Sequence, residues 1–141
     1  MLVYIFVLLS RYENSVRQGS NRDYIMNGKS LKKYVLALDL IDDSVLIQEY
    51  EKLHENVWPE IEATFPEAGI VELEIYRFQT RMIMIMTVNE TFSFERKNTM
   101  DLNNPKVQEW EELMWKYQKA VPGAKLGEKW VLMDKIYELK K

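Results

Sequence analysis

The chain has 141 residues, with 19 Lys and Arg against 22 Asp and Glu, one His and no Cys. A chain of this length is typical of one domain, and its 47% of apolar residues are enough to bury a core without disulfides. The lack of Cys excludes disulfides, thiolate metal sites and cysteine nucleophiles. A single His excludes a histidine-cluster metal site. The net charge of −3 argues against nucleic acid as a main partner.

The first 30 residues differ in composition from the rest. Nine apolar residues, MLVYIFVLL, open the chain, and a polar stretch rich in Asn, Ser, Gly and Arg follows up to Ser30. The apolar run is far shorter than the ~20 residues that span a bilayer, and it lacks the basic start and cleavage site of a secretory signal. We therefore predict an N-terminal extension over 1–30, a tail or a misplaced start rather than an export segment. A single domain follows over 31–141, in a cytoplasmic protein without a membrane partner.

The first part of this domain has the pattern of one strand and two helices. Tyr34–Leu40 is short, apolar and partly β-branched, which predicts a strand. Residues 41–44 predict a turn that supplies a helix N-cap, and apolar residues at helical spacing predict a helix over 45–57. Trp58-Pro59 interrupts this helix, because the residue before a proline is disfavoured in the α region. We expect a second, short helix over 59–63 at an angle to the first.

A β-hairpin is predicted in the middle of the domain. Ile70–Phe78 alternates strictly, with Val71, Leu73 and Ile75 on one face of the strand. Arg81–Val88 reads RMIMIMTV and predicts the second strand, after a two-residue link.

Two helices and a strand are predicted after the hairpin. A short helix is expected over Phe92–Met100, and Pro105 starts a second helix whose apolar stripe runs to Val121. Lys129–Leu139 predicts the last strand.

The order β-α-β-β-α-β predicts an α+β domain. It is typical of the ferredoxin-like fold, a four-stranded antiparallel sheet with helices on one face. The uncovered face is too apolar and aromatic for water, so we expect a homodimer formed sheet to sheet.

The densest functional candidate is the segment around His54. Tyr50 and His54 stand at i and i+4, so they share one helix face and can act on one ligand. Imidazole is the side chain best poised to exchange protons near neutral pH. A lone helical His is more often a packed or solvated residue. Here, however, Trp58-Pro59 breaks the helix just after it, and sites often form at irregular backbone.

Weaker candidates lie further along the chain. Glu72 and Glu74 share a strand face and could do acid/base work, although a solvated face is the commoner arrangement. Trp110 is core by default, but an aromatic platform also holds the apolar face of a sugar ring. Trp130 is interpreted as packing, and the charge run of Glu109, Glu111 and Glu112 as a solvated helix face.

The segment Tyr50-xxx-His54-xxx-Trp58-Pro59-Glu60 resembles the signature of the L-rhamnose mutarotase family. The resemblance continues through GIVELEIY, RMIMIM and NPKVQEW to the last predicted strand, and it covers about residues 33–139. Members of this family are small dimeric α/β-barrel proteins that interconvert the α and β anomers of a 6-deoxy sugar. The resemblance therefore implies a mutarotase acting on L-rhamnose or a related monosaccharide, without metal or cofactor.

The resemblance also implies roles for individual residues. His54 falls where the family has its proton donor, and Tyr50 falls on a sugar-binding tyrosine. Trp110 falls on the first member of a Trp-Trp pair that lines the sugar site, and Trp58 is expected to form a wall of the site.

Two positions depart from the family pattern. The second Trp position is Glu111, and a further sugar-binding tyrosine aligns with Leu73. Tyr76 does not replace that tyrosine, because three residues along a strand lead to the opposite face. These departures should alter recognition of hydroxyls more than catalysis, so an L-fucose-type sugar is an alternative substrate.

The implied reaction needs only proton transfer, with a proton given to the ring oxygen and one taken from the anomeric hydroxyl. We expect His54 to donate to the ring oxygen and Tyr50 to hold a neighbouring hydroxyl; Glu72, Glu74 or a water could serve as the second proton-transfer group. Two other classes stay open: a haem- or quinol-monooxygenase on the same dimeric barrel, and a catalytically inactive sugar-binding module.

Overall fold

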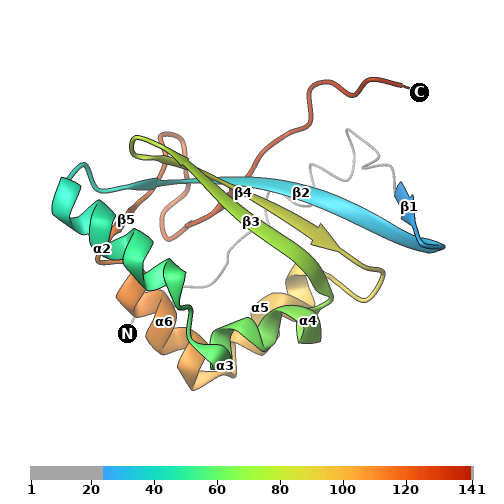
Figure 1. The fold of residues 1–141 in the computed structure, drawn as a ribbon, viewed down its shortest axis with the longest axis horizontal. Coiled ribbons are helices and arrows are strands. Elements are labelled where there is room, and N and C mark those ends of the chain that lie inside the picture. The colour runs from blue at the N-terminus through green and yellow to red at the C-terminus, as the bar shows by residue number, and fades with distance from the viewer. Residues whose placement is uncertain (1–23, 141) are drawn as a thin grey trace.

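One antiparallel sheet organises the protein, which is described here by a computed structural model over residues 24–140 (Figure 1). The central strand β2 (Lys29–Leu40) pairs with β4 (Arg81–Val88), which pairs in turn with β3 (Ile70–Phe78). Three short strands pair with β2, namely β1 (Tyr24–Met26), β5 (Gln118–Lys119) and β6 (Val131–Leu132). The predicted α+β class and the predicted hairpin are confirmed.

The helices lie together on one side of the sheet (Figure 1). They are α2 (Ser44–Glu55), α3 (Pro59–Glu62), α4 (Thr64–Ala68), α5 (Phe94–Leu102) and α6 (Pro105–Met114). None of the helices among the described residues is long and apolar enough to cross a membrane.

Local capping residues fix where the long helices begin. The Asp43 carboxylate accepts hydrogen bonds from the backbone N–H groups of Val45 and Leu46, at 2.9 and 3.1 Å, so the predicted N-cap of α2 is confirmed. Asn104 caps α6 in the same way, and Pro105 occupies the first turn, where its missing N–H costs nothing.

Alternate residues of β2 and β4 form the core beneath the helices. The buried side chains at this face are Leu36, Leu38, Leu40, Met82, Met84, Met86 and Val88. The three methionines of β4 therefore share the buried face of the sheet. An exposed ion pair, in which Arg77 Nε donates to Glu51 Oε1 at 2.6 Å, joins β3 to α2 across the end of this layer.

The prediction that Val71 shares a strand face with Leu73 and Ile75 is wrong. A β-bulge between Ile70 and Glu72 inserts one residue, and Val71 is left 49% exposed instead of facing the helices. Gly69, directly before the bulge, has φ +89° and ends α4. A Cβ at Gly69 would lie 2.5 Å from Thr91 Oγ1, so both the backbone angle and the space require glycine.

Two predicted elements are shorter in the structure. The helix that starts at Pro105 ends at Met114 rather than Val121, because the chain turns there so that β5 can pair with β2. The last strand pairs with β2 only at Val131–Leu132, and one further backbone hydrogen bond follows, from the Met133 N–H to the Val35 oxygen at 2.8 Å. Residues 133–140 leave on the side of the sheet opposite the helices (Figure 1).

The predicted boundary after residue 30 falls inside β2. Residues 29–31 of β2 pair with β1, and Asn27 and Gly28 form the turn between the two strands, both with positive φ. The remainder of the predicted extension, residues 1–23, lies outside the described residues.

Candidate active site

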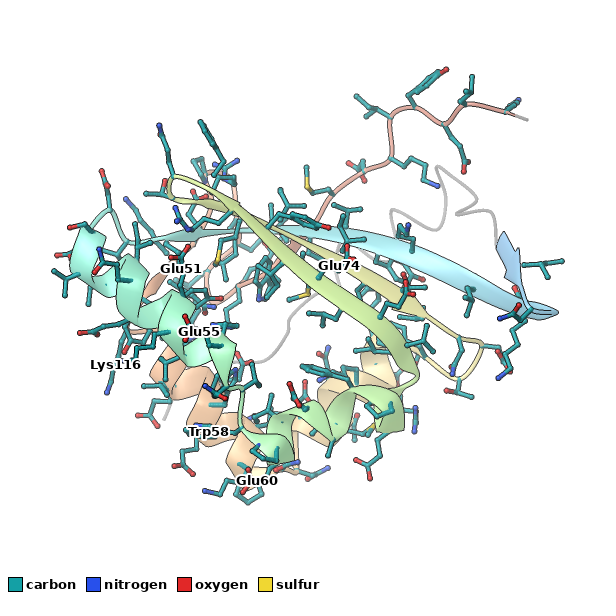
Figure 2. All side chains as sticks on the ribbon, in the orientation of Figure 1. Glu51, Glu55, Trp58, Glu60, Glu74 and Lys116 are labelled. Carbon is teal, nitrogen blue, oxygen red and sulfur yellow. The ribbon has the colours of Figure 1, made fainter. Side chains whose placement is uncertain are left out.

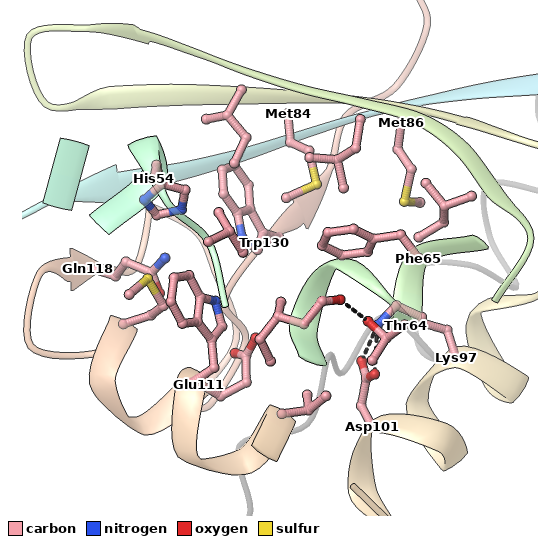
Figure 3. Close-up of a pocket in the computed structure, with 18 of the residues that line it drawn as sticks. His54, Thr64, Phe65, Met84, Met86, Lys97, Asp101, Glu111, Gln118 and Trp130 are labelled. Carbon is pink, nitrogen blue, oxygen red and sulfur yellow. Dashed lines mark hydrogen bonds and ion pairs between the residues drawn. The ribbon is translucent and has the colours of Figure 1, made fainter. Parts of the chain in front are cut away.

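A cavity of about 130 Å³ lies between the sheet and the helices. Its walls differ in chemistry. In Figure 3, Met84 and Met86 border it from the sheet, His54, Gln118 and Glu111 gather at one end, and Lys97 and Asp101 lie at the other. The further apolar lining includes Phe65, Leu73, Ile75, Phe92, Trp110 and Trp130. Such an amphipathic cavity suits a small ligand that has both a hydrocarbon surface and several hydroxyl groups.

The protonation of His54 follows from its hydrogen bond. Its Nδ1 lies 2.8 Å from the backbone oxygen of Tyr50, one turn earlier in α2. A carbonyl oxygen only accepts, so Nδ1 carries the hydrogen and Nε2 keeps a lone pair. Burial lowers the pKa of His54 below its ordinary value of 6.5, and the backbone hydrogen bond opposes this only in part. The imidazole is therefore neutral at pH 7, with Nε2 ready to accept a proton.

A row of aromatic rings holds this imidazole in place. The His54 ring lies 4.2 Å from the ring of Tyr50 and 5.7 Å from that of Trp110, centroid to centroid. The Trp58 ring packs edge-on against Trp110 at 5.1 Å. Trp58 sits where α2 gives way to α3 (Figure 2) and stands behind Trp110 rather than among the residues that line the cavity. Tyr50, His54 and Trp110, all predicted site residues, thus meet at one wall.

Gln118 completes the wall beside Tyr50. Its Nε2 donates to Tyr50 Oη at 3.4 Å, and its Oε1 is buried with no hydrogen-bond partner among the described residues. Burial raises the pKa of Tyr50 to about 12, which the hydrogen bond from Gln118 opposes and the charge of Glu111 reinforces. The phenol of Tyr50 therefore keeps its proton throughout the physiological range. Gln118 is not a predicted site residue, since nothing local in the sequence marks it.

The prediction of a solvated helix face is wrong for Glu111, which is half-buried, whereas Glu109 and Glu112 are exposed as predicted. Glu111 Oε2 accepts from Lys129 Nζ at 2.6 Å, and its backbone oxygen accepts from the same Nζ at 3.1 Å. The Lys129 side chain is only 2% exposed, and its ammonium lies 4.8 Å from the centre of the Trp115 ring. Burial lowers the pKa of Lys129, while Glu111 opposes that shift. Glu111 thus forms a buried ion pair and also lines the cavity.

A second buried ion pair lies at the far end of the cavity. Lys97 Nζ is 2.6 Å from both carboxylate oxygens of Asp101, one turn further along α5. Burial raises the pKa of Asp101, and Lys97 counteracts this. The i, i+4 spacing in the sequence is consistent with an ion pair, but it carries no sign that the pair is buried.

The remaining predicted positions lie where the strand pattern places them. Leu73 is half-buried and lines the cavity from β3. Glu72 and Glu74 are exposed on the other face of β3, where Glu74 accepts a hydrogen bond from the Tyr76 hydroxyl at 2.8 Å. Neither carboxylate lines the cavity beside His54. Trp130, interpreted as packing, lines the cavity as well.

Comparison with known proteins identifies the class. A sequence model described as L-rhamnose mutarotase matches residues 33–139. The chain is 45% identical over 112 residues to the L-fucose mutarotase of Xanthomonas campestris pv. campestris, which covers 78% of this chain and 90% of that protein. It is 35% identical over 121 residues to a UPF0734 protein of Dictyostelium discoideum, with coverage of 81% and 94%.

A solved structure shares the fold. The crystal structure of an L-rhamnose mutarotase from Formosa agariphila matches 77% of this chain and 99% of its own, with a TM-score of 0.57 and 15% identity. The antiparallel sheet with its helical layer and the sequence matches define an isomerase that acts on carbohydrates. The chain belongs to the L-rhamnose mutarotase family. The resemblance seen in the sequence is thereby confirmed.

Proposed function

We propose that the protein interconverts the α and β anomers of a 6-deoxy sugar of the L-rhamnose or L-fucose type, with His54 as the group that moves the proton. The observation that carries this proposal is the neutral imidazole, whose Nδ1 hydrogen is engaged by the Tyr50 carbonyl so that Nε2 remains available. Tyr50, Trp110, Glu111 and Leu73 are the proposed sugar-binding residues, and Trp58 supports Trp110 from behind.

One imidazole can serve both oxygens of the reacting centre, because both are bonded to the anomeric carbon. Nε2 of His54 takes the proton of the anomeric hydroxyl. The bond between the anomeric carbon and the ring oxygen then breaks, and its electron pair goes to the ring oxygen. The imidazolium returns the same proton to that oxygen, which leaves an open-chain aldehyde. Rotation of the carbonyl and the reverse sequence give the other anomer, with no net gain or loss of protons.

The amphipathic cavity supports a 6-deoxy sugar. The sheet wall of Leu73, Ile75, Met84 and Met86 offers apolar contact for a methyl group and the C–H face of a pyranose. The hydroxyls would meet the polar groups of the helices. The family model supports an L-rhamnose-type substrate, and the 45% identical relative supports an L-fucose-type one.

Anomer exchange measured by NMR tests this function. Saturation of one anomeric proton of L-rhamnose or L-fucose should transfer to the other anomer when the full chain is added, with a D-hexose as the comparison sugar. Line broadening without transfer would instead support a sugar-binding module. A haem titration should leave the Soret band of haem unchanged, and a shifted band would support the monooxygenase alternative.

The rate of exchange should depend on pH through His54. An imidazolium has no lone pair on Nε2, so we expect exchange to fall as the pH drops through the pKa of His54. Because burial lowers that pKa, the midpoint should lie below 6.5 and the rate should be level at pH 7 and above. The measurement is the enzymatic exchange rate from pH 5 to 8, corrected for the uncatalysed rate. A rate that declines above pH 6 would show that His54 must begin as an acid.

We propose further that the protein is a homodimer that covers the outer face of its sheet. Strand register places Val35, Ile83 and Ile85 on this face, and Tyr76 and Phe78 beside them are 56% and 77% exposed. Light scattering after gel filtration should give about twice the chain mass of 16.9 kDa. Ile85→Glu should give the mass of a single chain, and a monomeric wild-type protein would contradict the proposal.

A further inference from the structure

We propose that Gln118 determines substrate specificity: with Tyr50 it binds one hydroxyl group of the sugar, which donates to Gln118 Oε1 and accepts from the Tyr50 phenol. This inference rests on the proposed function and extends it to a residue outside the sequence motif.

The first observation is an unmatched buried acceptor at the cavity. Gln118 is 6% exposed, lines the cavity, and has no hydrogen-bond partner for Oε1 among the described residues. A buried acceptor without a donor is unfavourable in the free protein, and such groups are rare in native structures. A ligand that donates a hydrogen bond at this point would remove that cost.

The second observation is that Gln118 is held in position. Gln118 belongs to β5 and pairs with Leu40 of β2. Beside this pair, the backbone N–H of Ile41 donates to the backbone oxygen of Tyr117 at 2.8 Å. The amide end is oriented by the hydrogen bond from Nε2 to Tyr50 Oη. Oε1 therefore occupies a fixed place beside Tyr50, and the Gln118 side chain does not have to be ordered when the ligand binds.

The pair selects a particular chemical group. Because Tyr50 Oη accepts from Gln118 Nε2, its own hydrogen is left to donate elsewhere. The two side chains thus present one donor and one acceptor next to each other. A hydroxyl can satisfy both, whereas a carbonyl or carboxylate oxygen cannot donate to Oε1. Since the Tyr50 ring also contacts His54, the selected hydroxyl lies near the reacting end of the sugar.

Gln118→Met tests the inference, since methionine has a similar size but neither polar atom. We expect KM for the better sugar to rise roughly 5- to 15-fold while kcat changes less than twofold, because a hydrogen bond present before and during the reaction contributes to binding alone. Lys119→Met is the matched control, as its side chain is exposed on the same strand. It should leave both constants unchanged.

Sugars that lack one hydroxyl locate the contact. Among the 2-, 3- and 4-deoxy analogues, one should lose on the wild-type protein at least the factor that Gln118→Met loses on the full sugar, because it gives up the contact with Tyr50 as well. On the variant, the same analogue should lose less than it loses on the wild-type protein, because only the contact with Tyr50 is left to give up. Independent losses for all three analogues would overturn the assignment.

Thermal stability separates binding from a structural role. Because Oε1 is unpaired, Gln118→Met should keep or raise Tm, whereas a structural residue would lower it. If the wild-type protein exchanges anomers and Gln118→Met matches its KM, the role of Gln118 is overturned and the proposed function stands. If the wild type binds sugar without exchange, dissociation constants replace KM in the same comparison. If it neither exchanges nor binds these sugars, both proposals fail.

Discussion

His54→Ala should slow anomer exchange by roughly 10²- to 10⁴-fold, which is the usual contribution of a positioned acid or base. The variant loses the nitrogen that moves the proton, while the cavity walls from the sheet and from α5 stay intact. The measurement is saturation transfer between the anomeric protons at matched protein concentration. Unfolding in urea, followed by circular dichroism, shows whether the variant remains folded.

Two further variants sharpen this result. His54→Asn keeps a side-chain N–H that can reach the Tyr50 carbonyl but has no group that titrates near neutral pH, so it should be as slow as His54→Ala. Lys52→Ala changes an exposed residue of the same helix and should exchange at the wild-type rate. Exchange by His54→Asn within threefold of the wild type would contradict the catalytic role.

Lys129→Met should be the most destabilising of the substitutions considered. It leaves the Glu111 carboxylate without its partner in a largely buried place, which typically costs about 3–5 kcal/mol. The lower end of that range applies, since Glu111 keeps 19% of its side chain exposed and can regain some water. Tm should fall by roughly 10 °C or more for a domain of this size.

A double variant tests whether the pair itself is responsible. Lys129→Met with Glu111→Gln removes both charges, and it should recover much of the stability lost by Lys129→Met alone. Urea midpoints of the wild type, both single variants and the double variant complete the cycle. Additive effects would mean that the two charges do not interact, and a loss below about 1 kcal/mol for Lys129→Met would mean that the ammonium contributes little.

The sequence predicts well those features that local spacing determines. The i, i+4 relation of Tyr50 and His54 does place both side chains at one cavity, because it depends only on helix geometry. Trp58-Pro59 does interrupt the helix, with Pro59 at the start of α3. Alternation along β3 correctly separates Leu73 from Glu74, since successive residues of a strand face opposite sides.

Local sequence patterns could not predict the features that depend on contacts between residues far apart in the chain. Gln118 meets a residue 68 positions earlier, and Lys129 pairs with a residue 18 positions before it. Periodicity gives the face of an element but not the partner that covers it. For this reason Glu111 had the pattern of an exposed charge, and the bulge that displaces Val71 left no trace in the alternation.

The atom that holds His54 Nδ1 is the backbone oxygen of Tyr50. The tautomer of His54 is therefore independent of the side chain at residue 50, although the two side chains share one site. Tyr50→Phe would remove the phenol hydroxyl. The carbonyl that accepts from His54 Nδ1 would remain, because it is a backbone group that any residue at position 50 supplies. Evolution or design can therefore exchange the side chain at residue 50 to suit another sugar, and the helix itself continues to keep the imidazole in its reactive tautomer.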